Sequence, residues 1–269
     1  MQPIDPQTRI VFWTKDLKEI WKPRIDRMSK VVALTELETF LQGLRSVYVY
    51  HIHSDKFEES YAFLRKFDLV FYPITKSAVY YGFSHRHLPV KPGKPYHLYG
   101  VCVKRGREKL AEKFLEASRE GDHATVGKLL GYPKCCIDFF CNTWPKSLDP
   151  IYQIAQNTEN HRENKESIEV IVHPFCNQML RYLGIRITPH LPCSFECKET
   201  IKLGEQWFKI MKKIDKEASE WILDLLSSPI TWDCYRAVAI VDTPYFRLIT
   251  NSVPTEERLR VLNLGFSSI

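Results

Sequence analysis

Four of the eight cysteines lie in two short stretches, and their spacing suits metal binding. The stretch LLGYPKCCIDFF (129–140) contains the adjacent pair Cys135 and Cys136, and PHLPCSFEC (189–197) contains Cys193 and Cys197. Cysteine thiolates are the usual ligands of iron–sulfur clusters and of structural zinc ions. We therefore expect these four residues to form one metal centre.

Both cysteine pairs are predicted to lie at the start of a helix. Pro133 suits the first turn of a helix, which places the first pair in that turn. Ser194 is a good N-cap residue, which places Cys193 just outside the second helix and Cys197 in its first turn. Helix N-termini carry partial positive charge that favours thiolate. Two such ends would repel each other unless the thiolates and a metal ion lay between them.

Three further residues are candidates for additional ligands or for residues that orient the ligands. His173 precedes Cys176 by three residues in HPFC, and His190 precedes Cys193 by three residues in HLPC. Imidazole binds zinc or iron, so each of these groups is a candidate ligand, although each histidine could equally be an ordinary loop residue. The remaining cysteines lie in apolar stretches and are expected to be buried core thiols: Cys102, Cys141 and Cys234.

An iron–sulfur cluster is the preferred cofactor, and zinc is the alternative. Two adjacent cysteines reach one compact zinc tetrahedron with difficulty, whereas the corners of a cluster are farther apart. The order of a tandem pair followed by a close pair also loosely resembles the cluster domains of heterodisulfide reductases, although Ile137 replaces their glycine. A metal-free thiol enzyme that uses Cys193 with His190 or His173 is a further alternative. A cluster with an open iron would suit redox chemistry, sulfur handling or modification of a nucleotide or RNA, and the alternative is a non-catalytic RNA- or protein-binding module in which zinc is structural. The sequence does not decide whether the chain is an enzyme.

Two basic segments are candidates for binding RNA or an anionic nucleotide-like ligand. The chain has a net charge of +6 and only eleven glycines, with no phosphate-binding glycine motif. A turn before a predicted helix start could hold a phosphate, and a proline-rich loop contains paired histidines. The candidate contacts are Lys104, Arg105, Arg107, His85, Arg86 and His87. The simpler interpretation of both segments is a solvated surface.

The order of apolar and polar residues predicts an α/β or α+β fold. Residues 1–95 are expected to form an N-terminal mixed sheet with flanking helices, and residues 96–269 a mainly helical cysteine-motif domain, although one continuous domain would also fit. Helices are predicted at residues 16–44 (interrupted at Pro23), 55–67, 107–121, 122–131, from 133, at 177–184 and at 194–226, the last as one long helix or a broken pair. Strands are predicted at residues 45–54, 68–75, 78–84, 96–104, 167–175 and 185–190, with a hairpin over 236–250.

The N-terminal residues lack the apolar run of a signal peptide, and no window is long and apolar enough to span a membrane. A cytoplasmic location is therefore expected. In a reducing cytoplasm, clustered cysteines indicate metal binding or catalysis more than disulfides, although disulfide-rich intracellular proteins of hyperthermophiles are an exception. The sequence gives no oligomeric state.

The cysteine motifs resemble those of an archaeal family of uncharacterised proteins. The resemblance depends on LLGYPKCCIDFF, HPFCN and HLPCSFEC, and it extends to the DTPYF segment near residue 242. It corresponds to the motifs GYPxCC, HPxCN and HxPCSxxC. The family supplies no activity, but the resemblance implies an archaeal, cytoplasmic protein and directs attention to the same cysteines.

Overall fold

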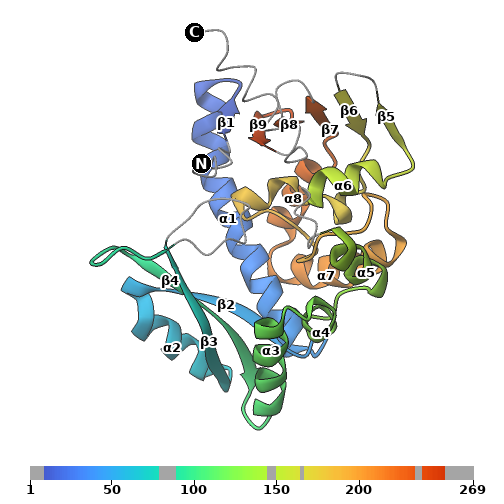
Figure 1. The fold of residues 1–269 in the computed structure, drawn as a ribbon. Coiled ribbons are helices and arrows are strands. Elements are labelled where there is room, and N and C mark those ends of the chain that lie inside the picture. Colours follow the sequence, from blue (N-terminus) through green and yellow to red (C-terminus); the bar gives the residue numbers. More distant parts are fainter. Residues whose placement is uncertain (1–8, 79–88, 144–149, 164–166, 234–237, 252–269) are drawn as a thin grey trace. The chain divides into compact units, whose positions relative to one another are not determined.

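The computed structural model describes residues 9–78, 89–143, 150–163, 167–233 and 238–251. The chain forms two compact units, one of residues 1–35 and 138–269 and one of residues 36–137. Both units contain helices and antiparallel strands, which confirms the α+β class (Figure 1). The second unit includes residues on both sides of the boundary expected after residue 95, and separate folding of residues 1–95 and 96–269 stays a prediction.

The unit of residues 36–137 is built on a three-stranded sheet with the order β2-β4-β3. Its strands are β2 (Tyr48–His53), β3 (Leu69–Ala78) and β4 (Tyr96–Lys104). Both pairings are antiparallel, so the sheet is not the mixed sheet that we expected. Strand β3 extends past the predicted end at residue 75, and the strand predicted at 78–84 lies almost entirely outside the described residues.

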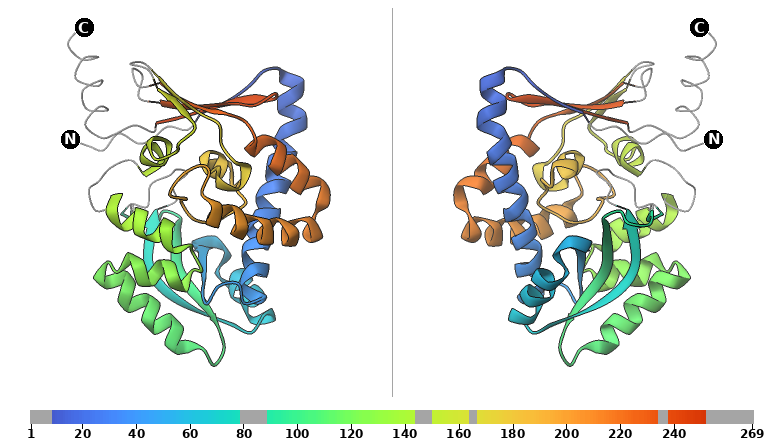
Figure 2. Two further views of the ribbon diagram at one scale, coloured as in Figure 1. Left: turned by 90° about the vertical axis from the view of Figure 1, so that its right-hand side faces the viewer. Right: turned by 90° about the vertical axis from the view of Figure 1, so that its left-hand side faces the viewer.

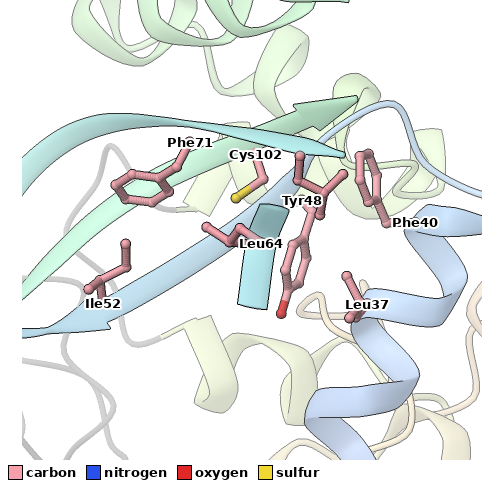
Figure 3. Packing of buried hydrophobic residues seen from close by; sticks show 8 residues of the cluster. Leu37, Phe40, Tyr48, Ile52, Leu64, Phe71 and Cys102 are labelled. Carbon is pink, nitrogen blue, oxygen red and sulfur yellow. The ribbon is translucent and has the colours of Figure 1, made fainter. Parts of the chain in front are cut away.

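Each face of this sheet packs against a helix, because side chains alternate between the two faces of a strand. On one face, Tyr48, Ile52 and Cys102 pack with Leu64 of α2 (Phe57–Lys66), which follows the short 3₁₀ helix η1 (Ser54–Lys56) (Figure 3). On the other face, valines of β2 and β4 and their neighbours pack with α3 (Glu108–Glu120) (Figure 1). The second core comprises Val47, Val101, Val103, Ala111, Phe114, Leu129 and Leu130.

Two helices of this unit begin and end where the sequence predicts. Helix α3 ends at Gly121, whose φ of 71° lies in the left-handed region that favours glycine. The carboxylate of Asp122 then accepts a hydrogen bond of 2.9 Å from the N–H of Thr125 and caps α4 (His123–Leu129). These caps confirm the predicted turn between the two helices.

The other unit contains a six-stranded antiparallel sheet, and the sequence predicted three of its strands, one at the start of the 167–175 segment and two in the hairpin over 236–250. Its strand order is β1-β9-β8-β7-β6-β5. The strands are β1 (Arg9–Phe12), β5 (His161–Glu163), β6 (Ser167–Val170), β7 (Ile230–Asp233), β8 (Val238–Asp242) and β9 (Phe246–Asn251). The hairpin predicted over residues 236–250 is confirmed as β8 and β9. Ile168, Trp232 and Ala239 lie on its buried face.

Helices α6 (Pro150–Gln156), α7 (Lys198–Ile214) and α8 (Lys216–Leu226) lie on one side of this sheet (Figure 2). Two 3₁₀ helices, η3 (Pro174–Cys176) and η4 (Met179–Leu183), precede residues 185–190. The strand predicted at 185–190 is wrong. The Thr188 carbonyl instead accepts a hydrogen bond of 3.0 Å from the Gln178 amide, and the Thr188 hydroxyl donates one to the Phe175 carbonyl. Side chains, and not a neighbouring strand, therefore provide these hydrogen-bond partners.

The predicted interruption at Pro23 is also wrong, because α1 (Lys15–Leu41) continues through it. Proline removes one backbone donor, which leaves the carbonyl of Glu19 without its helical partner. Pro23 lies on the exposed side of the helix, where water can satisfy that carbonyl. No helix within the described ranges is both long and apolar enough to cross a membrane.

Candidate metal centre

The four cysteines singled out from the sequence lie together in the structure. Their ligand atoms all lie within 4.8 Å of one another, and the Sγ atoms of Cys135 and Cys136 are 3.8 Å apart. Among the residues that the structure describes, they are the one such group of three or more His, Cys, Asp or Glu side chains. Cys136 and Cys197 are buried, Cys193 is half-buried and Cys135 is exposed. This arrangement is a candidate metal site.

The first pair is positioned by the start of α5 (Lys134–Thr143). Gly131, with a φ of 75°, reverses the chain after α4, and Pro133 follows. The carbonyl of Pro133 accepts hydrogen bonds of 3.0 Å from the N–H groups of Cys136 and Ile137. Cys135 and Cys136 therefore lie in the first turn of α5, as predicted, and their sulfur atoms experience the positive end of the helix dipole.

The second pair lies in a turn that leads into α7. Ser194 was predicted to cap this helix, but the N-cap residue is Cys197, one turn farther along the chain. The Ser194 hydroxyl instead accepts a hydrogen bond of 3.3 Å from the N–H of Glu196, which forms a local turn before the helix. Cys197 keeps its place at a helix N-terminus, so the expected favourable dipole holds for this residue.

Two polar residues that sequence analysis missed hold this turn in place. Asn157 donates a hydrogen bond of 2.7 Å from Nδ2 to the carbonyl of Cys193. The Thr158 hydroxyl accepts a hydrogen bond of 2.9 Å from the N–H of Phe195. Both residues follow α6, and nothing in the sequence links them to a turn more than thirty residues away. They fix the backbone that carries the second cysteine pair.

The three additional candidates lie near this turn, but none belongs to the group of four. The Cys176 thiol contacts the carbonyl of Cys197 at 3.8 Å, and burial raises its pKa. Nδ1 of His173 accepts a hydrogen bond from the N–H of Phe175 and caps η3. His190 is buried with Nε2 at 2.9 Å from the Thr200 hydroxyl. Metal ligation by these three residues stays a prediction.

The basic candidates make contacts within the chain. Lys104 donates a hydrogen bond to the carbonyl of Leu41, and Arg105 forms an ion pair of 2.8 Å with Asp68. Arg107 is the N-cap residue of α3, and its side chain makes no capping bond. Phosphate or RNA binding by this turn stays a prediction, and His85, Arg86 and His87 lie outside the described residues.

Of the thiols expected in the core, Cys102 is confirmed as buried, whereas Cys141 is not fully buried. Cys102 is buried in the sheet of residues 36–137, and burial raises its pKa to about 12. Cys141 is half-buried on α5, and Cys234 lies outside the described residues. The seven cysteines that the structure describes form no disulfide bonds with one another. The cysteines of the candidate centre are thus reduced, as metal binding requires, and would ligate a metal ion as thiolates.

Comparisons with known proteins confirm the resemblance to an archaeal family without a known function. Residues 101–228 match the model of a family described as "Protein of unknown function (DUF483)". The chain is also similar to an uncharacterised protein, MJ1106, of Methanocaldococcus jannaschii, with 30% identity over 111 residues. This match covers 39% of the chain and 52% of the relative, so the chain spans about half of its length. No solved structure gives a significant match. All four cysteines of the candidate centre lie inside residues 101–228.

Proposed function

We propose that Cys135, Cys136, Cys193 and Cys197 bind one tetrahedral metal ion, with zinc as the ion that fits best. The observation that carries this proposal is the spacing of the four sulfur atoms. A zinc–sulfur bond of about 2.3 Å at tetrahedral angles separates neighbouring sulfurs by about 3.8 Å. The distance between the Sγ atoms of Cys135 and Cys136 is 3.8 Å, and all four ligand atoms lie within 4.8 Å.

This spacing favours a single ion over the iron–sulfur cluster preferred on sequence grounds. That preference assumed that adjacent cysteines reach one tetrahedron with difficulty, and the short distance between the two sulfurs removes the objection. A four-iron cluster binds each cysteine to a different iron, which requires the sulfur atoms to be farther apart. The iron–sulfur centre remains the alternative that the same experiment detects.

The number of ligands supports a structural role for the ion. Four cysteine ligands complete the tetrahedral coordination of zinc and leave no position for water or substrate, which is typical of structural sites. The ion would fasten the start of α5 to the turn before α7. We therefore favour a non-catalytic module, which binds RNA or another protein, over redox, sulfur-handling or nucleotide-modifying chemistry at the metal.

The test is to measure zinc, iron and acid-labile sulfide in full-length protein purified without oxygen. We expect one zinc ion per chain, no matching iron and sulfide, and no visible colour. Cys136→Ser and Cys197→Ser should each lose most of the zinc, whereas the control Cys141→Ser, on the same helix, should retain it. Equal zinc content in all four proteins would contradict the proposal. Iron with matching sulfide would support the cluster instead.

Cobalt substitution gives an independent readout of the ligands. Co²⁺ bound by four thiolates has intense charge-transfer absorption and strong visible bands, because sulfur donates charge to the metal. We expect these bands in the wild-type protein and in Cys141→Ser, and weaker bands in Cys136→Ser. Circular dichroism on the same samples separates the loss of a ligand from the loss of the fold.

A further inference from the structure

Three histidines lie on one face of the sheet in the unit of residues 36–137. His51 and His53 are two residues apart on β2, so their side chains are on the same face. His97 on β4 is the direct cross-strand partner of His53, and Tyr99 is the partner of His51. Cross-strand partners share a face and are close enough for their side chains to interact. The pairing therefore places all three imidazoles in one cluster.

The distances between the rings agree with this placement. The ring centroids of His53 and His97 are 5.1 Å apart, and those of His51 and His97 are 6.3 Å apart. Val101 and Val103 farther along β4, with Val47 just before β2, pack against α3 and α4 on this face. The histidines occupy the end of the face beyond that core, where His51 is exposed and the other two are half-buried.

His97 contains a buried nitrogen that has no hydrogen-bond partner. Its Nδ1 atom is inaccessible to solvent and makes no hydrogen bond. A buried polar atom without a partner is destabilising, and native proteins rarely contain one unless it has a role or a ligand. Burial, with the neighbouring His53, also lowers the pKa of His97 and favours the neutral imidazole. Neutral imidazole is the form that binds metal ions.

Asp55 supplies the carboxylate that is often found beside a metal-binding histidine. Its carboxylate oxygen Oδ2 is 3.6 Å from Nδ1 of His53, and its N–H donates a hydrogen bond of 3.2 Å to the same nitrogen. Histidine ligands usually donate their second ring N–H to a carboxylate or carbonyl group. With a metal ion on Nε2, the ring proton would be on Nδ1, which would then give up the hydrogen bond from the Asp55 N–H and donate one to Oδ2, after these two atoms approach from their present 3.6 Å.

We propose that His51, His53 and His97 bind a divalent first-row transition metal ion, a site separate from the cysteine centre. Imidazole ligands suit zinc, copper and nickel. The three rings do not converge fully in this conformation, so binding requires the exposed His51 side chain to rotate toward His97. Three protein ligands leave a fourth position for water or an anion, which is the ligand number of catalytic zinc sites. These histidines lie outside residues 101–228, the segment that matches the family model.

The test uses full-length protein that has first been saturated with zinc and dialysed. Its zinc content is measured by metal analysis, and a further Zn²⁺ titration is monitored by isothermal calorimetry. The wild-type protein should bind one more zinc ion than His51→Gln/His97→Gln. His51→Gln alone, at an exposed position, should weaken the additional site by about tenfold or more, and Asp55→Asn by about 10- to 100-fold. His123→Gln, which changes another half-buried histidine of the unit, is the control.

The result depends only on differences between these variants, so it is independent of what the cysteines bind. Circular dichroism checks that each variant is folded. If the double variant does not fold, the single variant His51→Gln still tests the proposal. Equal zinc number and affinity in the wild type and His51→Gln would overturn the proposal. Equal losses in His51→Gln and the control His123→Gln would also overturn it, because binding would then be nonspecific.

Discussion

The imidazole of His190 and the hydroxyl of Thr200 lie 2.9 Å apart, from Nε2 to Oγ1, in a buried position beside the second cysteine pair. Burial lowers the pKa of His190 to about 4, whereas the pKa of an unfolded histidine is about 6.5. Between these values the unfolded chain binds a proton that the folded chain does not. The free energy of unfolding therefore falls as the pH decreases from about 6.5 toward 4.

We expect this residue to contribute about 2 kcal/mol to the loss of stability between pH 7.5 and pH 5, and up to about 3 kcal/mol over its whole titration range. The measurement is urea denaturation of zinc-saturated wild-type protein and His190→Gln at pH 7.5 and pH 5. The variant should lose less stability than the wild type between the two pH values, since glutamine does not titrate. Acid release of metal affects both proteins and cancels in the comparison. Identical losses would show that His190 is not the titrating group.

The alkylation pattern of the thiols should reveal metal binding directly. Cys135 is exposed, so without metal it should react rapidly with iodoacetamide, whereas bound metal should protect it. Cys102 should resist alkylation with or without metal, because it is buried and its pKa is raised to about 12. Mass spectrometry of peptides before and after chelation checks both expectations. Rapid alkylation of Cys135 in the zinc-saturated protein would contradict ligation by this residue.

Replacing Asp122 with alanine should destabilise the unit of residues 36–137. The Asp122 carboxylate accepts a hydrogen bond of 2.9 Å from the Thr125 N–H at the start of α4. Loss of such a cap costs about 0.5–2 kcal/mol. Thermal unfolding of Asp122→Ala should show a lower Tm, and Glu120→Ala, at an exposed position nearby, is the control. A Tm equal to that of the control would mean that the cap is dispensable.

Replacing Gly127 with alanine should also lower stability, although alanine favours a helix. A Cβ atom at Gly127 would lie 2.7 Å from Cγ1 of Ile137, which is too close for a real contact. Overpacking of this kind costs about 1–3 kcal/mol, and the gain in helix propensity of about 1 kcal/mol offsets part of it. Urea denaturation of Gly127→Ala measures the net effect.

Lys128→Ala, on the exposed side of the same helix, is the control for Gly127→Ala. Since Ile137 directly follows the first cysteine pair, Gly127→Ala should also reduce zinc content if Ile137 is pushed aside. Unchanged stability would show that α5 adjusts to the added methyl group without cost.

Local signals predicted the parts of the fold that depend on neighbours in sequence. Gly121 ends α3 and Asp122 caps α4, because both effects involve residues only a few positions away. The adjacency of Cys135 and Cys136 to Pro133 likewise predicted that they would lie in a first helical turn. The gathering of the four cysteines was expected from their chemistry alone, and what they bind stays a prediction.

The predictions of secondary structure that failed have a common physical cause: contacts that the local sequence pattern does not reveal. Strand β1 pairs with β9, so that Arg9 is opposite Ile249, and no local pattern of four residues indicates such a partner. The predicted strand at 185–190 failed because the amide of Gln178 satisfies the carbonyl of Thr188. Ser194 is a residue type favoured at the N-cap, but its hydroxyl accepts a hydrogen bond from the N–H of Glu196 in a local turn. The helix therefore begins after Cys197.

The separation of the cysteine pairs along the chain has a consequence for when the metal can bind. If Cys136 and Cys193 bound one ion, they would close a loop of about 57 residues, and closing such a loop in a disordered chain costs about 4 kcal/mol of entropy. The folded chain has already brought the two pairs together. An unfolded chain would consequently bind the ion with all four thiols about a thousandfold more weakly. An ion at this site would therefore bind tightly only after the chain has folded far enough to bring the two pairs together.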